Sequence, residues 1–298
     1  MRSSVRTAIV TGASAGIGRE LARQLVRDRG MSVLVTARRR DRLESLAAEL
    51  PEGGLRIESG DLTDEAFRDR LWQRAMEEFP GGPDLLVNNA GIGHYAEFDQ
   101  EDPAILRAIV ELNIIAPMDL TRRALSAMKA RGHGQVMFVS SVLGFVGLPY
   151  SSAYAASKHA INGLVRSLRY ELAGSGVRVW ATCPNRTESE FHAVALGQRP
   201  GDAPRRAPYA EPTDRVVRQM VRAIDRRMAF HFPGTSARWV VEASRLLPGP
   251  FDWFMRTWAP AHFRSEMERA SGEPEISRPF ASDLSPQQDA DTGRPPGT

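Results

Sequence analysis

The chain has 298 residues, of which 42% are hydrophobic and 25% charged. This composition is typical of a globular protein with a large core, and it excludes collagen-like, disulfide-rich and wholly disordered classes. The 39 basic and 36 acidic residues leave a net charge of only +3, so bulk charge gives no reason to expect a nucleic-acid partner.

The pattern of apolar residues argues against a membrane-spanning or secreted protein, and the pattern of cysteine and histidine residues argues against a disulfide or a metal site. No apolar stretch approaches the ~20 residues of a membrane-spanning helix, and the first residues are too polar for a secretory signal, so we expect a cytoplasmic protein. Cys183 is the only cysteine, and none of the six histidines lies near another at metal-ligand spacing. The sequence therefore predicts neither an internal disulfide nor a metal site.

Short β-branched runs alternate with longer amphipathic segments over most of the chain. Strands alternating with helices indicate βαβ units with right-handed crossovers and a parallel sheet buried on both faces. The sequence thus predicts an α/β fold with a doubly wound parallel sheet of about seven strands and helices on both faces. The predicted strands are 5–11, 32–37, 55–59, 84–88, 134–140, 177–183 and 229–232, and the predicted helices are 17–29, 42–50, 64–79, 103–130 and 153–173.

Three regions of different composition follow one another. We expect residues 1–235, which contain all the predicted strands, to form the main domain, with the proline-rich stretch 188–212 as a loop after the sixth strand. Residues 236–270 read as an aromatic-rich helical extension, and residues 271–298 as a disordered tail. Within 238–270, aromatic residues among arginines leave open a packed extension, a peripheral membrane contact, a partner surface or a substrate cover.

A glycine-rich turn follows the first predicted strand. It reads Thr11-Gly12-Ala13-Ser14-Ala15-Gly16-Ile17-Gly18 and opens a predicted helix. In this position glycines allow a pyrophosphate to approach the backbone at the positive end of the helix. The spacing G-x-x-x-G-x-G differs from the commoner G-x-G-x-x-G, so the turn alone is weak evidence against a simple tight loop.

Other motifs lie at the ends of later strands and in the helices after them. They are Asp61-Leu62, Asn88-Asn89-Ala90-Gly91, Asn113, Ser141 and Tyr154-Ala155-Ala156-Ser157-Lys158, in that order. With these motifs, residues 5–235 resemble the single-domain short-chain dehydrogenase/reductase family of the NADP-preferring type. The resemblance implies a Rossmann-like fold and an oxidoreductase that transfers hydride between a nicotinamide and a carbonyl or alcohol. Residues 1–235 are then expected to form a dinucleotide-binding catalytic domain, in which the stretch 188–212 is either a substrate loop or a plain surface loop.

The chemistry of the tyrosine and lysine follows from their spacing. Residues at i and i+4 share one face of a helix, so Lys158 is expected to lie near the phenol of Tyr154. A nearby positive charge favours the phenolate, so we expect it to lower the pKa of Tyr154 toward neutral pH. Proton transfer in either direction then becomes accessible.

The resemblance assigns four catalytic roles. Tyr154 is the general acid or base, Ser141 binds the substrate oxygen, and Lys158 binds the nicotinamide ribose. Asn113 is expected to hold a water that links Lys158 to solvent. Ser140 competes with Ser141 for the serine role, but adjacent strand residues face opposite sides, and the family's spacing from the tyrosine favours Ser141.

The resemblance also implies the residues that hold the cofactor, and the end of the second strand indicates its type. No carboxylate precedes Asp41 there, and Arg38 with Arg39 as second candidate offers a guanidinium for the extra phosphate of NADP, although a solvated basic turn is the alternative. The basic residue that many NADP-using relatives carry in the glycine turn is replaced here by Ala15. The other expected cofactor contacts are Gly12, Ser14, Gly16, Ile17, Gly18, Asp61, Leu62, Asn89, Ala90, Gly91, Tyr154, Lys158, Pro184 and Thr187.

Two details near the expected substrate are less regular. After the sixth strand, Pro184-Asn185 replaces the family's Pro-Gly, and we expect Asn185 to keep the turn because asparagine tolerates a positive φ. His94 and Tyr95 either line the substrate mouth or lie in an exposed loop.

The function favoured by these motifs is NADP-dependent reduction of a hydrophobic carbonyl, or oxidation of the matching alcohol, on a ketone, aldehyde, 3-oxoacyl or steroid-like substrate. An epimerase or dehydratase of the same fold and an inactive dinucleotide-binding regulator are the alternatives. A homo-oligomer is expected, because relatives commonly assemble through the helices that carry Asn113 and Tyr154.

Overall fold

The structure is a computed structural model that describes residues 5–188, 210–234 and 236–270, with side chains described up to residue 259. Most of the predicted substrate loop 188–212 and the whole predicted tail 271–298 lie outside the described residues. Those two predictions therefore stay untested.

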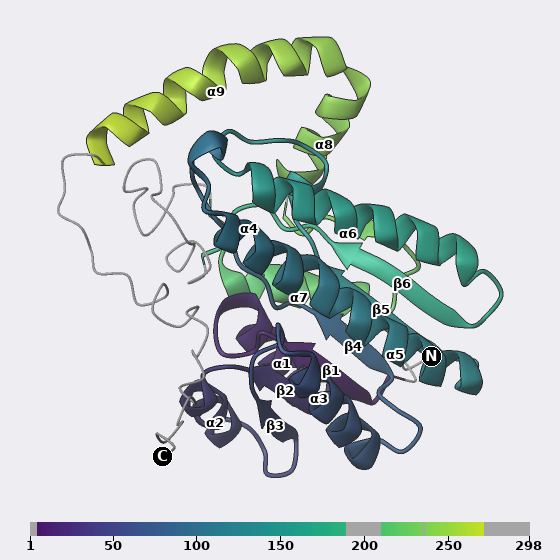
Figure 1. The fold of residues 1–298 in the computed structure, drawn as a ribbon. Helices are drawn as coiled ribbons and strands as arrows, with labels where there is room; N and C mark the ends of the chain where they lie inside the picture. Colours follow the sequence, from purple (N-terminus) through teal and green to yellow (C-terminus); the bar gives the residue numbers. More distant parts are fainter. Residues whose placement is uncertain (1–4, 189–209, 235, 271–298) are drawn as a thin grey trace, which may run out of the picture.

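A seven-stranded sheet forms the centre of the molecule (Figure 1), with the strand order β3-β2-β1-β4-β5-β6-β7 and every pair parallel. This confirms the predicted α/β fold. Because the chain winds outward from β1 in one direction and then from β4 in the other, the strand order reverses between these two strands, where such sheets bind ligands. The strands are β1 Thr7–Thr11, β2 Ser32–Ala37, β3 Leu55–Ser59, β4 Leu85–Asn88, β5 Gly134–Val139, β6 Val177–Thr182 and β7 Phe230–His231.

Helices cover both faces of the sheet (Figure 1). One face carries α1, α2 and α7, and the other carries α3, α5 and α6, each with its own apolar cluster. The helices are α1 Gly16–Arg29, α2 Arg40–Ala48, α3 Glu65–Glu78, α4 Pro103–Val110, α5 Ala116–Arg131, α6 Ser152–Glu171, α7 Thr213–Ala223, α8 Ser236–Leu246 and α9 Pro248–Ala270.

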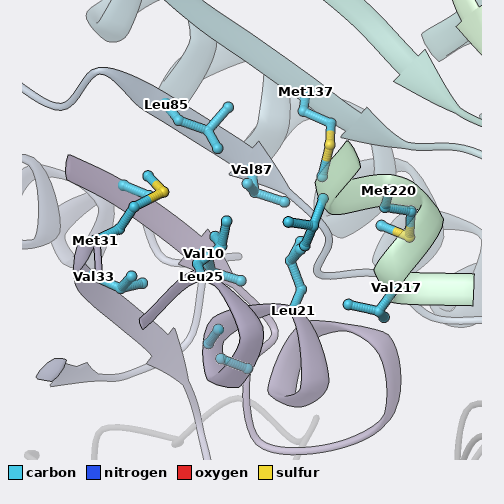
Figure 2. Close-up of a cluster of buried hydrophobic side chains, with 14 of the residues drawn as sticks. Val10, Leu21, Leu25, Met31, Val33, Leu85, Val87, Met137, Val217 and Met220 are labelled. Carbon is cyan, nitrogen blue, oxygen red and sulfur yellow. The ribbon is translucent and has the colours of Figure 1, made fainter. Parts of the chain in front are cut away.

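Alternate residues of β1, β2, β4, β5 and β6 enter opposite clusters, because successive strand side chains point to opposite faces. Val10 of β1 and Val87 of β4 pack with Leu21 and Leu25 of α1 and with Val217 of α7 (Figure 2). Their strand neighbours join the cluster on the other face, against α3, α5 and α6. The central strands are therefore buried on both sides, as a parallel sheet requires.

The predicted helix 103–130 differs from the structure. A π-helical turn, Glu111–Ile115, separates α4 from α5. Pro117 supplies the physical reason, since it has no N–H to donate to the carbonyl of Asn113, its α-helical partner. The N–H of Ala116 instead reaches back to the carbonyl of Glu111, the wider spacing of a π turn.

The C-terminal segment is helical and only partly packed. Ala237 and Val241 of α8 are buried against Val142 and Val146, next to the end of β5. Helix α9 extends away from the sheet (Figure 1) and stacks Phe254 on Trp258 with ring centroids 5.4 Å apart. Among the described residues, no helix has the length and apolarity needed to span a membrane.

A buried arginine ties α3 to the π turn. Arg68 donates through Nη1 to the carbonyl of Leu62 at 2.7 Å and to Glu111 Oε1 at 3.0 Å, and through Nε to Asp119 Oδ2 at 3.1 Å. Its side chain is 5% exposed. Removal of a buried ionic partner is strongly destabilising, whereas exposed ion pairs contribute little.

We expect Arg68→Leu to lower the free energy of unfolding by about 3 kcal/mol, because it leaves the buried carbonyl of Leu62 and the partly buried Asp119 without this donor. Arg74→Ala is the matched control on the same helix: its side chain is 44% exposed and pairs with Glu77 and Glu78, and we expect it to cost less than about 1 kcal/mol. Urea unfolding of both variants measures the difference. Equal losses would contradict the structural role given to Arg68.

Candidate active site

The side chains of the Tyr-x-x-x-Lys motif lie together in the first turns of α6, beside the carboxyl end of β5. The phenol of Tyr154 hydrogen-bonds to the side chain of Ser141, the second residue after β5. The ammonium of Lys158 lies 5.5 Å from the centroid of the Tyr154 ring. The structure thus brings Ser141, Tyr154 and Lys158 to one place.

Lys158 is 5% exposed and donates to the carbonyl of Val139 at 3.0 Å. Burial lowers its pKa to about 8, since a low-dielectric environment disfavours the charged form. Most Lys158 side chains are therefore charged at neutral pH, which lies only slightly below this pKa.

The pKa of Tyr154 differs from the sequence-based expectation. Burial raises it above its ordinary value, and the hydrogen bond with Ser141 only partly opposes this effect. The phenol is consequently neutral at neutral pH in this structure. It has a proton to donate, which is the form that a general acid requires.

The two adjacent serines have different surroundings. Ser140 is buried and its Oγ donates to Asn162 Oδ1 at 2.7 Å. The Oγ of Ser141 accepts the backbone N–H of Leu143 at 3.1 Å and faces Tyr154. The geometry therefore agrees with the preference for Ser141 over Ser140.

Asn113 lies in the π turn and makes backbone contacts. Its Oδ1 accepts the N–H of Ile92 at 2.9 Å, and its Nδ2 donates to the carbonyl of Ile92 at 2.9 Å and to Ser157 Oγ at 3.1 Å. It thus fixes the loop after β4 to α6, one residue before Lys158. A Cβ at Gly91 would lie 3.0 Å from Asn113 Oδ1, so glycine suits this crowded position.

The glycine turn packs closely against the loop after β4. Gly12 has a φ of +68°, and a Cβ there would lie 2.8 Å from the Cα of Ala90. A Cβ at Gly18 would clash with Asn89 Nδ2 and with the carbonyl of Gly12. Asn89 itself donates to the carbonyl of Thr11 at 2.8 Å, so residues expected to hold one cofactor come together from two loops.

The basic residues after β2 lie beside this turn and beside the loop after β3. Arg39 donates to Ser14 Oγ from Nε at 3.3 Å and from Nη2 at 3.1 Å. Arg38 is half-exposed and lies 3.9 Å from a carboxylate oxygen of Asp61. Both guanidinium groups are therefore near the predicted nucleotide site.

A family model of short chain dehydrogenases matches residues 6–198, which include every one of these motifs. The chain belongs to the short-chain dehydrogenase family. The match confirms the predicted family. The expected NADP preference and substrate class stay predictions.

Relatives of this short-chain dehydrogenase are named oxidoreductases. An uncharacterized oxidoreductase of Myxococcus xanthus is 37% identical over 194 residues, which are 64% of this chain and 76% of that one. Dehydrogenase/reductase SDR family member 7 of Mus musculus is 31% identical over 261 residues, 84% of this chain and 74% of that one.

Solved structures of the same fold contain nicotinamide cofactors of both types. A short-chain dehydrogenase from Sphingobium yanoikuyae in complex with NADPH is 29% identical with a TM-score of 0.69, covering 85% of this chain and 96% of that chain. One from Burkholderia phymatum in complex with NAD is 22% identical with a TM-score of 0.70, covering 83% and 96%. At that lower identity the likeness concerns the fold alone.

One expectation about the substrate side of this short-chain dehydrogenase is wrong. Tyr150, with a φ of 62°, is the only non-glycine residue with a positive φ in the described part of the chain. Asn185 therefore does not replace the family's glycine by adopting a positive φ. Its side chain donates to Ser236 Oγ at 3.0 Å instead, and Thr187 is buried with Oγ1 donating to the carbonyl of Asn185.

The remaining expected residues occupy varied positions. Asp61 accepts the N–H of Thr63 at 2.9 Å, Leu62 is buried, and the carbonyl of Pro184 accepts the N–H of Val142. His94 is buried against the side chain of Glu101, so it does not lie in an exposed loop. Tyr95 is partly buried and lies close enough to Tyr154 to help raise its pKa.

Sequence reasoning missed two buried polar residues of the site. The Oγ1 of Thr11 accepts the N–H groups of Asn89 and Ala90, each at 2.9 Å, and so joins the glycine turn to the loop after β4. Asn162 holds the loop after β5 by two side-chain hydrogen bonds. The only sequence signal for Asn162 is its spacing of four residues from Lys158, which places both on one face of α6.

We expect Lys158→Met to be more stable than the wild type at pH 7. Unfolded Lys158 keeps its proton up to its ordinary pKa of 10.5, whereas folded Lys158 loses it near 8. Between these values the unfolded state binds more protons, so the wild-type free energy of unfolding rises by about 1.4 kcal/mol per pH unit. The free energy of unfolding of Lys158→Met lacks this rise with pH. The stability difference between the variant and the wild type should therefore shrink between pH 8 and 10.

Urea unfolding across that pH range measures the difference between the two proteins. Lys129→Met is the matched control, because Lys129 is exposed and is the only other lysine in the chain. A stability difference that stays constant with pH for Lys158→Met would show that the ammonium is not held in a buried site.

Proposed function

We propose that the protein is an NADP-dependent oxidoreductase that reduces a hydrophobic ketone or aldehyde, or oxidises the matching alcohol. The observation that carries this proposal is the hydrogen bond between the Ser141 hydroxyl and the half-buried, protonated phenol of Tyr154. Two hydroxyl groups that face each other beside a cation can bind one carbonyl oxygen, and one of them can protonate it.

Each residue then has a defined task on the substrate oxygen. Ser141 donates a hydrogen bond and stabilises the negative charge that develops there. Tyr154 gives its proton to that oxygen in reduction and takes it back in oxidation. Lys158, fixed by the carbonyl of Val139, keeps a positive charge near the phenolate that remains.

The residues of the first turn fit a dinucleotide. Ala15 at the N-cap of α1 offers no side-chain hydrogen bond, and the first turn of that helix contains no acidic residue. The N–H groups and positive end of the helix therefore favour an anion such as a pyrophosphate. A bound nicotinamide cofactor supplies the hydride that these side chains lack.

The residues after β2 support the phosphorylated cofactor. Arg39 reaches Ser14 Oγ in the glycine turn, and Arg38 lies near Asp61, another expected cofactor contact. A guanidinium pairs with a phosphate through charge-assisted hydrogen bonds. The similar structure from Sphingobium yanoikuyae, which is in complex with NADPH, supports the same choice. The structure in complex with NAD resembles this chain in fold alone, so it does not argue for NAD here.

The proposal also covers the substrate class and the partners of the protein. Aromatic side chains of Tyr95 and Tyr150 belong to the two loops that meet beside Tyr154, where the N–H of Ala96 donates to the carbonyl of Tyr150 at 3.1 Å. They favour a hydrophobic carbonyl compound. Exposed apolar side chains on α4 and α5 suit a homo-oligomer, and those on α8 and α9 suit a peripheral membrane contact.

We expect Tyr154→Phe to lower the turnover of carbonyl reduction by 100-fold or more, because positioned acids contribute about 10² to 10⁴. The affinity for NADPH should change little, since the phenol acts on the substrate proton. Tyr170→Phe removes a hydroxyl from the same helix at a side chain that is 79% exposed, and we expect normal turnover. Loss of NADPH absorbance with a panel of aldehydes, ketones and 3-oxoacyl thioesters measures both.

An active Tyr154→Phe variant, within about tenfold of the wild type, would contradict the proposed role of the phenol. It would show that a group other than this phenol protonates the substrate oxygen. A wild type that binds NADPH but oxidises none with any substrate would favour the regulatory alternative.

We expect Arg38→Asp and Arg39→Asp to shift cofactor preference from NADPH toward NADH, because a carboxylate repels phosphate and accepts ribose hydroxyls. A charge-assisted contact is worth about 1.5 to 3 kcal/mol, so at least a tenfold shift in the ratio of kcat/KM values is expected for one of them. Arg40→Asp, which loses only an exposed pair with Glu44, serves as the control. An unchanged preference in both variants would contradict the NADP assignment.

A further inference from the structure

One buried amide holds both ends of the loop that carries Ser141. Asn162 is 2% exposed. Its Oδ1 accepts the hydroxyl of Ser140 at 2.7 Å, and its Nδ2 donates to the carbonyl of Gly144 at 2.8 Å. Ser140 precedes Ser141, and Gly144 ends the short 3-10 turn Val142–Gly144 that follows it.

The fit between this loop and α6 is close. A Cβ at Gly144 would clash with Asn162 Nδ2 and would lie 2.8 Å from the carbonyl of Lys158. Only a residue without a side chain therefore lets the turn reach the helix. Asn162 in turn has both halves of its amide occupied, so rotation of the amide would break two buried hydrogen bonds.

Three residues at successive i+4 positions of α6 contact successive parts of the same stretch. Lys158 donates to the carbonyl of Val139, Asn162 bonds to Ser140 and Gly144, and Tyr154 bonds to Ser141. The distance between the Ser141 and Tyr154 hydroxyls is thus fixed by the docking of one helix face on one loop.

We propose that Asn162 is a positioning residue, which holds Ser141 at the place where its hydroxyl and that of Tyr154 reach the same substrate oxygen. This inference rests on the proposed function. Active-site groups must be held within about 0.5 Å of the productive geometry by such supporting hydrogen bonds. Asn162 touches neither substrate nor cofactor in this account and acts only through Ser141.

Asn162→Leu keeps the approximate volume and removes both hydrogen bonds. We expect the kcat of carbonyl reduction to fall by about 10- to 100-fold, because misplacement of a reacting group by ~1 Å has an effect of that size. The dissociation constant of NADPH should stay within about threefold, since the glycine turn and the arginines are untouched. Val165→Ala, a fully buried apolar residue one turn further along α6, controls for destabilisation and should keep its turnover below its melting temperature.

A double-mutant cycle with Ser141→Ala separates positioning from a general loss of structure. If Asn162 acts through Ser141, Asn162→Leu should cost less than about threefold in turnover once Ser141→Ala is present. Costs that multiply in the double variant would overturn the proposal.

Hydrogen exchange gives a readout that does not depend on activity. The N–H of Leu143 is held by Ser141 Oγ, so Asn162→Leu should speed exchange in a peptide covering residues 139–146 by tenfold or more, and Val165→Ala should not. Unchanged exchange in that peptide would overturn the positioning role even if the protein reduces carbonyls. Faster exchange in a protein that reduces no carbonyl would instead refute the proposed function and leave the loop contact standing.

Discussion

The ammonium of Lys158 is buried, and a buried cation must be hydrogen-bonded if the fold is to tolerate it. The carbonyl of Val139, the last residue of β5, accepts that bond at 3.0 Å. Helix α6 is thereby fixed against the carboxyl end of β5 at one point. Tyr154 and Asn162, one turn to either side of Lys158, then meet the loop that begins at Ser140.

The sheet determines where this contact lies. All seven strands are parallel, so the loops after β1, β2, β4, β5 and β6 meet at one edge. Gly12 and Gly18 let the first of these loops approach Asn89 in the loop after β4. The π turn sets Asn113 against the same loop, and Arg68 links that turn to the carbonyl of Leu62 after β3. The residues proposed to bind the nucleotide and to act in catalysis consequently belong to one connected set of hydrogen bonds and close contacts.

Much of this could be predicted from the sequence, because strand and helix periods and the glycine turn are local signals. The seven strands fall within or close to their predicted ranges. The π turn could not be predicted, since helical periodicity continues through Glu111–Ile115 and only Pro117 marks the change. The raised pKa of Tyr154 depends on its burial in the folded protein, and the side chain of Asn185 contacts Ser236, which lies 51 residues further along the chain. Asn162 was missed because a buried amide resembles any other polar residue until its partners are known.

The proposed mechanism depends most on proton transfer from the phenol of Tyr154 to the carbonyl oxygen as hydride arrives at the carbonyl carbon. Single-turnover reduction in H₂O and in D₂O, with NADPH and with NADPH deuterated at the transferred position, measures both transfers in one reaction. We expect deuterium in either place to slow the same kinetic step, and the solvent effect to vanish from the residual reaction of Tyr154→Phe. A wild-type step slowed by cofactor deuterium alone, or a solvent effect that persists in Tyr154→Phe, would contradict the claim.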